Sequence, residues 1–250
     1  MKTRKKLWIF LLSLFCLVLG GCGAQEGETE AEAPGVSWES LSFPQELEIL
    51  YATQFSAASS PEGYTKISIE DGLSYLVVPE GAAVPSGVPA EITVIQQPLD
   101  HIYLAATSAM DLFRALEAID KVTLSGVEAD GWYIPEAKEA MEQGRMEYAG
   151  KYRAPDYELL LSRSCDLAIE STMIYHTPEV KEQLEDFGVP VLVERSSYEN
   201  HPLGRMEWIK LYGLLLGRDR EHREDSGVFL HHLQWRGQCA KIRRLPGQSH

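Results

Sequence analysis

The chain has 250 residues, 44% hydrophobic and 24% charged, a composition typical of a globular protein and not of a disordered or multi-span membrane chain. Its formal charge of −14 argues against a nucleic-acid-binding protein, because such binding depends on Lys and Arg at the phosphates. The charge is uneven: residues 1–21 contribute +4, residues 218–250 contribute +3, and the stretch between them carries the remaining −21.

The first 21 residues have the organisation of a secretory signal peptide. Four cations precede an apolar run at 7–19, which is shorter than the roughly 20 residues of a membrane-spanning helix. The run ends in Leu19-Gly20-Gly21-Cys22, which resembles the lipobox of bacterial lipoproteins. We therefore expect a lipid on Cys22 and a flexible acidic tether over 22–45. An incidental Cys, or a short membrane anchor, is the alternative.

Residues 46–90 are predicted to form a lead-in rich in β-hairpins. Apolar runs that favour strands occupy 47–55, 64–69 and 73–78. The Glu70-Asp71-Gly72 break between the second and third runs is a hairpin signal. Residues 80–90 have the composition of a loop.

From residue 91 onward, short strands alternate with helices. Strands are expected at 92–95, 102–105, 122–124, 146–148, 166–170 and 189–193. Helices are expected at 109–119, 135–143, 157–164, 178–187 and 202–216, with Ser108 and Asp156 as N-caps of the first and third. This alternation implies parallel βαβ units with helices on both faces of a sheet. The predicted fold class is α/β, with a Rossmann-like lobe over 91–200 preceded by the small β-rich segment.

The sequence contains none of the common signatures of catalysis. It has no Gly-rich phosphate loop, GxSxG, HExxH or paired-Cys zinc pattern, so we expect no enzyme activity and no cofactor. A metal site built from His101, His176, His201 and Glu170 is conceivable, but three ordinary polar histidines near loops are the simpler interpretation. We assign no metal ligands.

Ligands of open α/β sheets gather at the carboxyl ends of the strands. The loops expected there carry alternating aromatic, hydroxyl and cationic side chains, which suits a bulky ligand with apolar planes and anionic groups. Any single one of these residues is as well explained as a solvated loop residue. The set favours binding, and its candidate contacts are Thr107, Ser108, Tyr152, Arg153, Ser171 and Arg195.

Several blocks of the chain occur in an order that resembles a known family. They are TSAMDLFRALEAIDKVTLSG, AGKYRAPDYELLLSRSCDLAIESTM and VKEQLEDFGVPVLVE, within residues 95–217. Together they look like the first lobe of periplasmic-type solute-binding proteins of ABC importers for iron complexes (siderophores, haem) and cobalamin. Cys165 stands where the family has Pro, which is a mild departure.

The resemblance implies two α/β lobes joined by one long rigid helix, of which residues 201–217 form the start. It places Tyr152 against the ligand and gives Glu158 the role of docking onto the permease. It also implies a lipid-anchored receptor on the outer or periplasmic side of the membrane, with an ABC permease, its ATPase and a small iron complex or corrinoid as partners. A receptor for a bare metal ion, or an envelope lipoprotein with an enzymatic or structural role, is the alternative.

Residues 218–250 do not fit this pattern. They hold four of the seven His and six Arg, as many Arg as the 196 residues before them. Our hypothesis is a frameshift near Gly217 that replaces the second lobe; a natural basic tail is the alternative. A single lobe leaves the ligand residues in open solvent, so we expect weak or absent ligand binding.

Overall fold

The computed structural model describes residues 35–218, and all that follows concerns this part of the chain. The predicted signal peptide, the lipid on Cys22, most of the tether and all of the basic tail after Arg218 lie outside the described residues. Within residues 35–218, no helix combines the length and the apolar character needed to span a membrane.

The β-rich segment forms a five-stranded sheet. In order across the sheet its strands are β1 (Gln45–Glu46), β2 (Phe55–Ser59), β3 (Thr65–Ile69), β4 (Ser74–Val78) and β5 (Ile92–Gln96). The first four are antiparallel, and β5 runs parallel to β4. The predicted hairpin at Glu70-Asp71-Gly72 is confirmed, with Gly72 at a φ of 92° in the turn. We refer to these strands as the first sheet.

Two sequence predictions about this segment are corrected by the structure. Most of the predicted run 47–55 is not a strand, because the backbone N–H groups of residues 50–54 donate to the carboxylates of Glu199 and Glu207 at 2.6–3.1 Å and not to a neighbouring strand. Its last residue, Phe55, begins β2. The strand at 92–95 pairs with β4, so it belongs to the first sheet and not to the Rossmann-like lobe.

The second sheet is entirely parallel, as the alternation of elements predicts. Its order is β12 (Val191–Glu194), β11 (Leu167–Ser171), β6 (Ile102–Leu104), β7 (Val122–Ser125) and β8 (Glu147–Tyr148). A separate antiparallel ladder follows β8 and consists of β9 (Gly150–Lys151) and β10 (Ala154–Pro155). The α/β fold class with a parallel sheet is confirmed.

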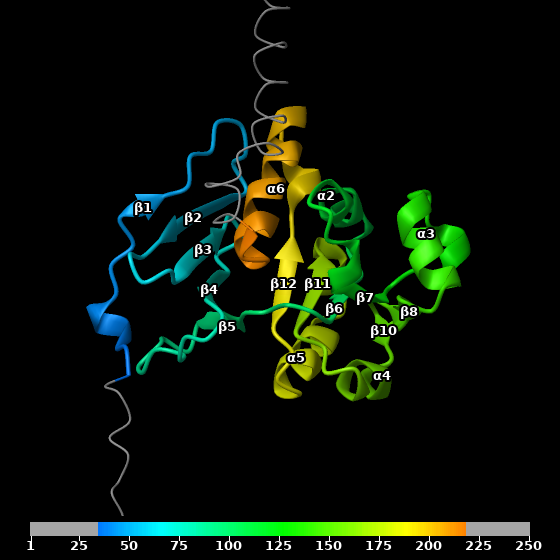
Figure 1. Cartoon of the computed structure of the whole chain (residues 1–250), viewed down its shortest axis with the longest axis horizontal. Coiled ribbons are helices and arrows are strands. Elements are labelled where there is room, and N and C mark those ends of the chain that lie inside the picture. The colour runs from blue at the N-terminus through cyan, green and yellow to red at the C-terminus, as the bar shows by residue number, and fades with distance from the viewer. Residues whose placement is uncertain (1–34, 219–250) are drawn as a thin grey trace, which may run out of the picture. The chain divides into compact units, whose positions relative to one another are not determined.

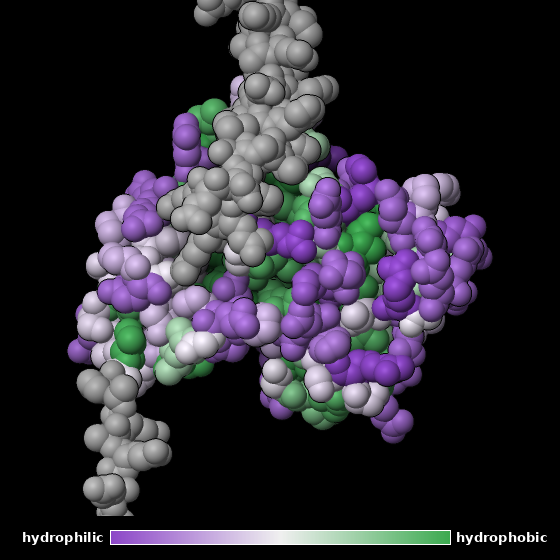
Figure 2. All heavy atoms as spheres, in the orientation of Figure 1, coloured by the Kyte–Doolittle hydropathy of each residue, from purple (hydrophilic) through white to green (hydrophobic). Residues whose placement is uncertain are grey.

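Five α-helices connect or cover these strands. They are α2 (Met110–Ala115), α3 (Pro135–Glu142), α4 (Tyr157–Ser162), α5 (Pro178–Asp186) and α6 (Pro202–Leu215). The shorter 3₁₀ segments are η1 (Trp38–Ser40), η2 (Thr107–Ala109), η3 (Ile119–Lys121), η4 (Ala129–Gly131), η5 (Thr172–His176) and η6 (Ser196–Tyr198). In Figure 2, hydrophilic side chains cover the face over α3.

Of the two predicted N-caps, one is confirmed. Asp156 accepts a hydrogen bond from the Leu159 N–H at 3.0 Å at the start of α4. Ser108 does not cap, since it lies inside η2 and its hydroxyl donates to Glu194. The predicted helix 109–119 is also shorter than expected: α2 ends at Ala115, and Glu117 follows with a φ of 54°.

One hydrophobic core joins the two sheets through α6, which lies between them in Figure 1. Trp208 of α6 packs edge-on against Phe55 of β2, with ring centroids 5.0 Å apart. Tyr212, one turn later, packs against Phe113 of α2 at 5.1 Å. A second cluster, with Tyr103, Leu160 and Leu184, fills the other face of the parallel sheet beneath α4 and α5. The first sheet is therefore part of the same core as the α/β lobe.

Candidate functional site

The carboxyl edge of the parallel sheet is the candidate site. Because β12, β11, β6, β7 and β8 are all parallel, the loops that follow them leave from the same edge. Those loops hold η6, η5, η2, residues 126–134 and the β9–β10 ladder. The structure therefore confirms that the loops chosen from the sequence follow parallel strands.

A pocket of about 440 Å³ opens at the ends of β6 and β7, in the size range of small-molecule sites. It is lined by Ala105, Gly126, Val127, Glu128, Asp130, Lys151 and Tyr152. Gly126 allows the two strand ends to approach closely, since a Cβ on it would lie 2.8 Å from the Cα of Ala105. Tyr152 is thus the sequence-predicted contact that lines this pocket.

The β9–β10 ladder holds Tyr152 at the pocket. The Tyr103 hydroxyl, from the buried face of β6, donates to the Gly150 carbonyl at 2.9 Å. Gly150 has a φ of 82°, and a Cβ there would lie 2.4 Å from the Ala154 carbonyl oxygen, so the tight turn requires glycine. Arg153, at the tip of the turn, is exposed.

A second surface of the same edge lies over η5 and η6. Met173, Tyr175 and Tyr198 are 46%, 44% and 51% exposed, and we call these three residues the aromatic shelf. The hydroxyls of Tyr198 and Thr172 are hydrogen-bonded at 2.9 Å, which joins the two segments. The candidate list drawn from the sequence omits all three shelf residues, although η5 and η6 directly follow β11 and β12.

Arg195, whose side chain is 17% exposed, is hydrogen-bonded to other side chains of the protein beside this shelf. Its Nε donates to Gln54 Oε1 at 3.1 Å, and its Nη1 lies 3.4 Å from Asp71 Oδ2. The guanidinium carbon also lies 4.8 Å from the ring centroid of Tyr198. The cation predicted to meet an anionic ligand is therefore already neutralised by a carboxylate of the first sheet.

Of the remaining predicted contacts, some are hydrogen-bonded within the protein and one is exposed. The Ser108 hydroxyl donates to Glu194 Oε2 at 2.8 Å, and Ser171 Oγ accepts from the Met173 N–H at 3.3 Å. Thr107 is exposed. The six predicted residues share one edge of the sheet but do not converge on one pocket.

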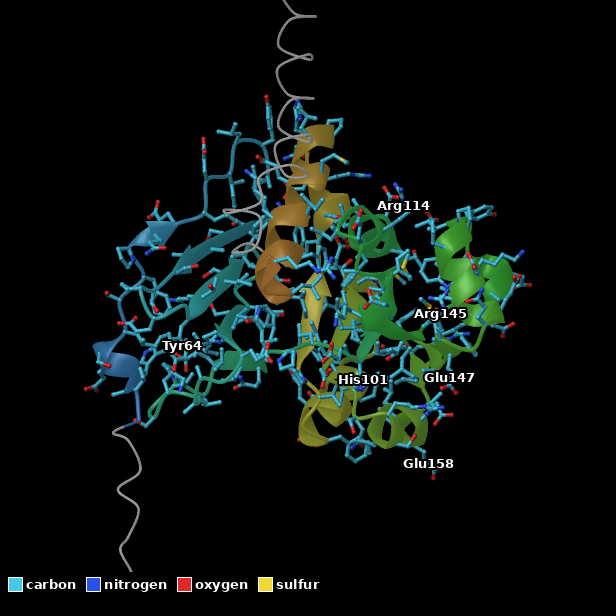
Figure 3. All side chains as sticks on the ribbon, viewed as in Figure 1. Tyr64, His101, Arg114, Arg145, Glu147 and Glu158 are labelled. Carbon is cyan, nitrogen blue, oxygen red and sulfur yellow. The ribbon has the colours of Figure 1, made fainter. Side chains whose placement is uncertain are left out.

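Glu158, the predicted permease contact, lies exposed on α4. Figure 3 shows its side chain pointing away from the sheet. It occupies the first turn of the helix, where an acidic side chain is favoured by the helix dipole. Its role in docking stays a prediction.

Glu170 of β11 is fully buried, and neither carboxylate oxygen has a hydrogen-bond partner among the described residues. Burial raises the pKa of this carboxyl to about 9. It is therefore a neutral acid at pH 7, beneath the carboxyl edge of the sheet.

Residues 35–218 bring together no group of three or more His, Cys, Asp or Glu side chains suited to a metal ion. His101 precedes β6, whereas His176 ends η5 after the carboxyl end of β11. His201 accepts from the Leu203 N–H at 3.0 Å and stacks on Tyr51 at 4.7 Å. The alternative of a bare metal ion bound by these three histidines is contradicted by their separation.

A further cavity of about 640 Å³ lies at the end of α6, beside the β2–β3 turn and the β5–β6 connection. Its charged lining includes Asp100 and Lys121, which pair with each other. None of the predicted ligand contacts lines it, so the carboxyl edge remains the better candidate.

No protein-family model matches the chain. An uncharacterized lipoprotein of Methanocaldococcus jannaschii is 20% identical over 164 residues, a match that covers 60% of this chain and 38% of that protein. Similar solved structures include the periplasmic haem-binding protein HutB of Vibrio cholerae, at 19% identity and a TM-score of 0.42, covering 59% of this chain and 51% of that one.

Two other solved structures are of the same kind. A periplasmic haem-binding protein of Pseudomonas aeruginosa is 17% identical, with a TM-score of 0.35 and coverages of 59% and 50%. The periplasmic vitamin B12-binding protein BtuF of Vibrio cholerae is 18% identical, with a TM-score of 0.32 and coverages of 51% and 49%. The chain thus spans about half the length of these solved proteins, which are of the class that the sequence blocks resemble.

Proposed function

We propose that this chain is the ligand-binding lobe of a solute-binding lipoprotein that serves an ABC importer. Its ligand is a bulky small molecule, an iron complex such as a siderophore or haem, or a corrinoid. The lipid on Cys22 holds it on the outer or periplasmic side of the membrane, and Glu158 contacts the permease, which works with its ATPase. Such a receptor captures and releases its ligand without chemistry.

The observation that supports the proposal is the carboxyl edge itself. The 440 Å³ pocket with Tyr152 and the half-exposed rings of the aromatic shelf lie along the ends of neighbouring parallel strands. Large ligands with apolar faces are held by aromatic side chains that remain partly exposed in the free protein.

Titration with haemin, a ferric hydroxamate siderophore and cyanocobalamin tests the proposal, with Trp fluorescence as the readout. Trp132 is a suitable reporter, since its indole N–H donates to Ser125 Oγ at 3.1 Å and the same hydroxyl donates to the carbonyl of Val127 in the pocket wall. A single lobe is expected to bind its ligand weakly or not at all, because residues 35–218 supply one wall of the site. The proposal requires the first case, so we expect weak, saturable quenching by one of the three ligands.

The matched variants are Tyr152→Ala and Tyr133→Ala. Tyr152 lines the pocket, whereas Tyr133 is 98% exposed beside the same edge. We expect Tyr152→Ala to weaken binding about tenfold and Tyr133→Ala to leave it unchanged. Absence of saturable binding for all three ligands, or equal effects of the two variants, would contradict the proposal.

A further inference from the structure

We infer that the β3–β4 turn of the first sheet is part of the carboxyl-edge site, with Asp71 as a positioning residue, and that the aromatic shelf binds a flat uncharged face of a ligand and not an anionic group. The inference rests on the proposed function, because it takes the aromatic shelf to be part of the ligand-binding surface. It also assigns a role to a β-rich segment that the sequence leaves unexplained.

Asp71 connects the first sheet to both segments of the shelf. Its Oδ2 accepts hydrogen bonds from the Tyr175 hydroxyl of η5 and from the Arg195 guanidinium that follows β12. Its Oδ1 accepts from the Leu73 N–H at 3.3 Å, which fixes the carboxylate in the turn. One carboxylate thus sets the positions of an aromatic ring and a cation from two different loops.

The pairing with Asp71 weakens the attraction of Arg195 for an anion. The Arg195 and Asp71 side chains are only 17% and 14% exposed, so water and salt screen their attraction less than that of a surface pair. The Nε of Arg195 donates its hydrogen bond to Gln54 Oε1, and the Tyr198 ring lies against the guanidinium. An anionic ligand group would have to compete with Asp71 for this cation.

What the shelf offers to a ligand is therefore the surface of its rings. The Tyr175 hydroxyl is bound to Asp71, and the Tyr198 hydroxyl is bound to Thr172 at 2.9 Å. Tyr175 and Tyr198 nevertheless remain about half exposed, as does Met173 of η5. Aromatic rings whose polar ends are satisfied bury flat apolar or conjugated groups with favourable stacking.

The first sheet is held in place by contacts that leave the turn little freedom. The Glu199 carboxylate accepts from the N–H groups of Thr53 and Gln54 at 2.8 and 3.0 Å, which brings the Gln54 side chain to Arg195. The Val193 N–H donates to the Tyr75 hydroxyl at 3.3 Å, which ties β4 to β12. The shelf is thus organised before any ligand arrives.

Two fluorescent probes of similar shape and different charge test the inference. N-phenyl-1-naphthylamine is neutral, and 8-anilinonaphthalene-1-sulfonate is an anion. We expect the wild-type chain to bind the neutral probe more tightly, and Asp71→Asn to raise the affinity for the sulfonate about tenfold by freeing Arg195. Asp111→Asn is the matched control, since Asp111 forms an exposed pair with Arg114 on α2.

Two further variants separate an effect on probe binding from an effect on the stability of the protein. The double variant Asp71→Asn with Arg195→Gln should lose the gain for the sulfonate, and Tyr198→Ala should weaken the neutral probe. A spectroscopic readout accompanies them: burial and the bond to Asp71 raise the pKa of Tyr175, so Asp71→Asn should bring one tyrosine to a lower pKa in an absorbance titration.

The inference is overturned if Asp71→Asn changes the two probe affinities no more than Asp111→Asn does, or if the wild-type chain prefers the sulfonate. If the probes behave as expected but haemin, siderophore and cyanocobalamin do not bind, the proposed function fails and the charge assignment of the shelf stands.

Discussion

Replacement of Glu170 by Gln should stabilise the protein at neutral pH. Glu170 is fully buried, and neither oxygen has a hydrogen-bond partner among the described residues. Burial raises the pKa of its carboxyl to about 9, from an ordinary value of 4.5. The folded protein must therefore keep this group protonated at a pH where the unfolded chain ionises it.

The sign and size of the effect follow from that difference in pKa. Because the folded-state pKa is raised, the stability contributed by Glu170 is fully present below pH 4.5 and is lost as the pH rises toward 9. At pH 7 the loss is about 3 kcal/mol, from roughly 1.4 kcal/mol for each pH unit above the unfolded pKa. Gln has nearly the same shape and never ionises, so it avoids this loss.

Urea unfolding at pH 4.5 and pH 7 measures the effect. We expect the free energy of unfolding of Glu170→Gln, relative to that of wild type, to be about 3 kcal/mol higher at pH 7 than at pH 4.5. Glu158→Gln is the matched control, because it makes the same substitution at an exposed carboxyl on α4. The change between the two pH values should be larger for Glu170→Gln than for this control. If wild type and Glu170→Gln show parallel pH profiles, the carboxyl finds a partner or water in solution and burial does not raise its pKa.

Two further substitutions probe the contacts that organise the site. Glu207→Ala should lower the free energy of unfolding in urea by about 3 kcal/mol, because the N–H groups of Leu50, Tyr51 and Ala52 lose their acceptor; a loss within the error of the fit would contradict this. Gly150→Ala should lower the thermal midpoint more than Gly144→Ala, since both have positive φ but only a Cβ at Gly150 meets backbone atoms; equal shifts would refute it.

Local signals in the sequence predict local structure well. Asp156 caps α4 because its side chain meets an N–H three residues away, and the Glu70-Asp71-Gly72 turn closes between strands that are neighbours in the chain. The parallel sheet follows from the alternation of strands and helices, since parallel neighbours require crossovers. Its carboxyl edge, and the position of Tyr152 there, follow from the same topology.

Contacts between distant parts of the chain are what the sequence does not reveal. The strand at 92–95 has the composition of any buried strand, and nothing local tells that β4 is its partner. The run 47–55 favours a strand by propensity, but Glu207, about 150 residues later, binds its N–H groups. The sequence around Arg195 likewise does not indicate an ion pair, because its partner Asp71 is 124 residues away in the chain.

The segment that follows β12 links the stability of the fold to the charge at the candidate site. Arg195 pairs there with Asp71, and four residues later Glu199 accepts from the N–H groups of Thr53 and Gln54. Glu199 also accepts from the Trp208 indole at 2.9 Å, and that ring packs on Phe55 of the first sheet. A change that loosens the first sheet from α6 would therefore also release Arg195 from Gln54 and Asp71. The β-rich segment is thus a wall of the lobe, and loss of its packing should alter ligand charge preference together with stability.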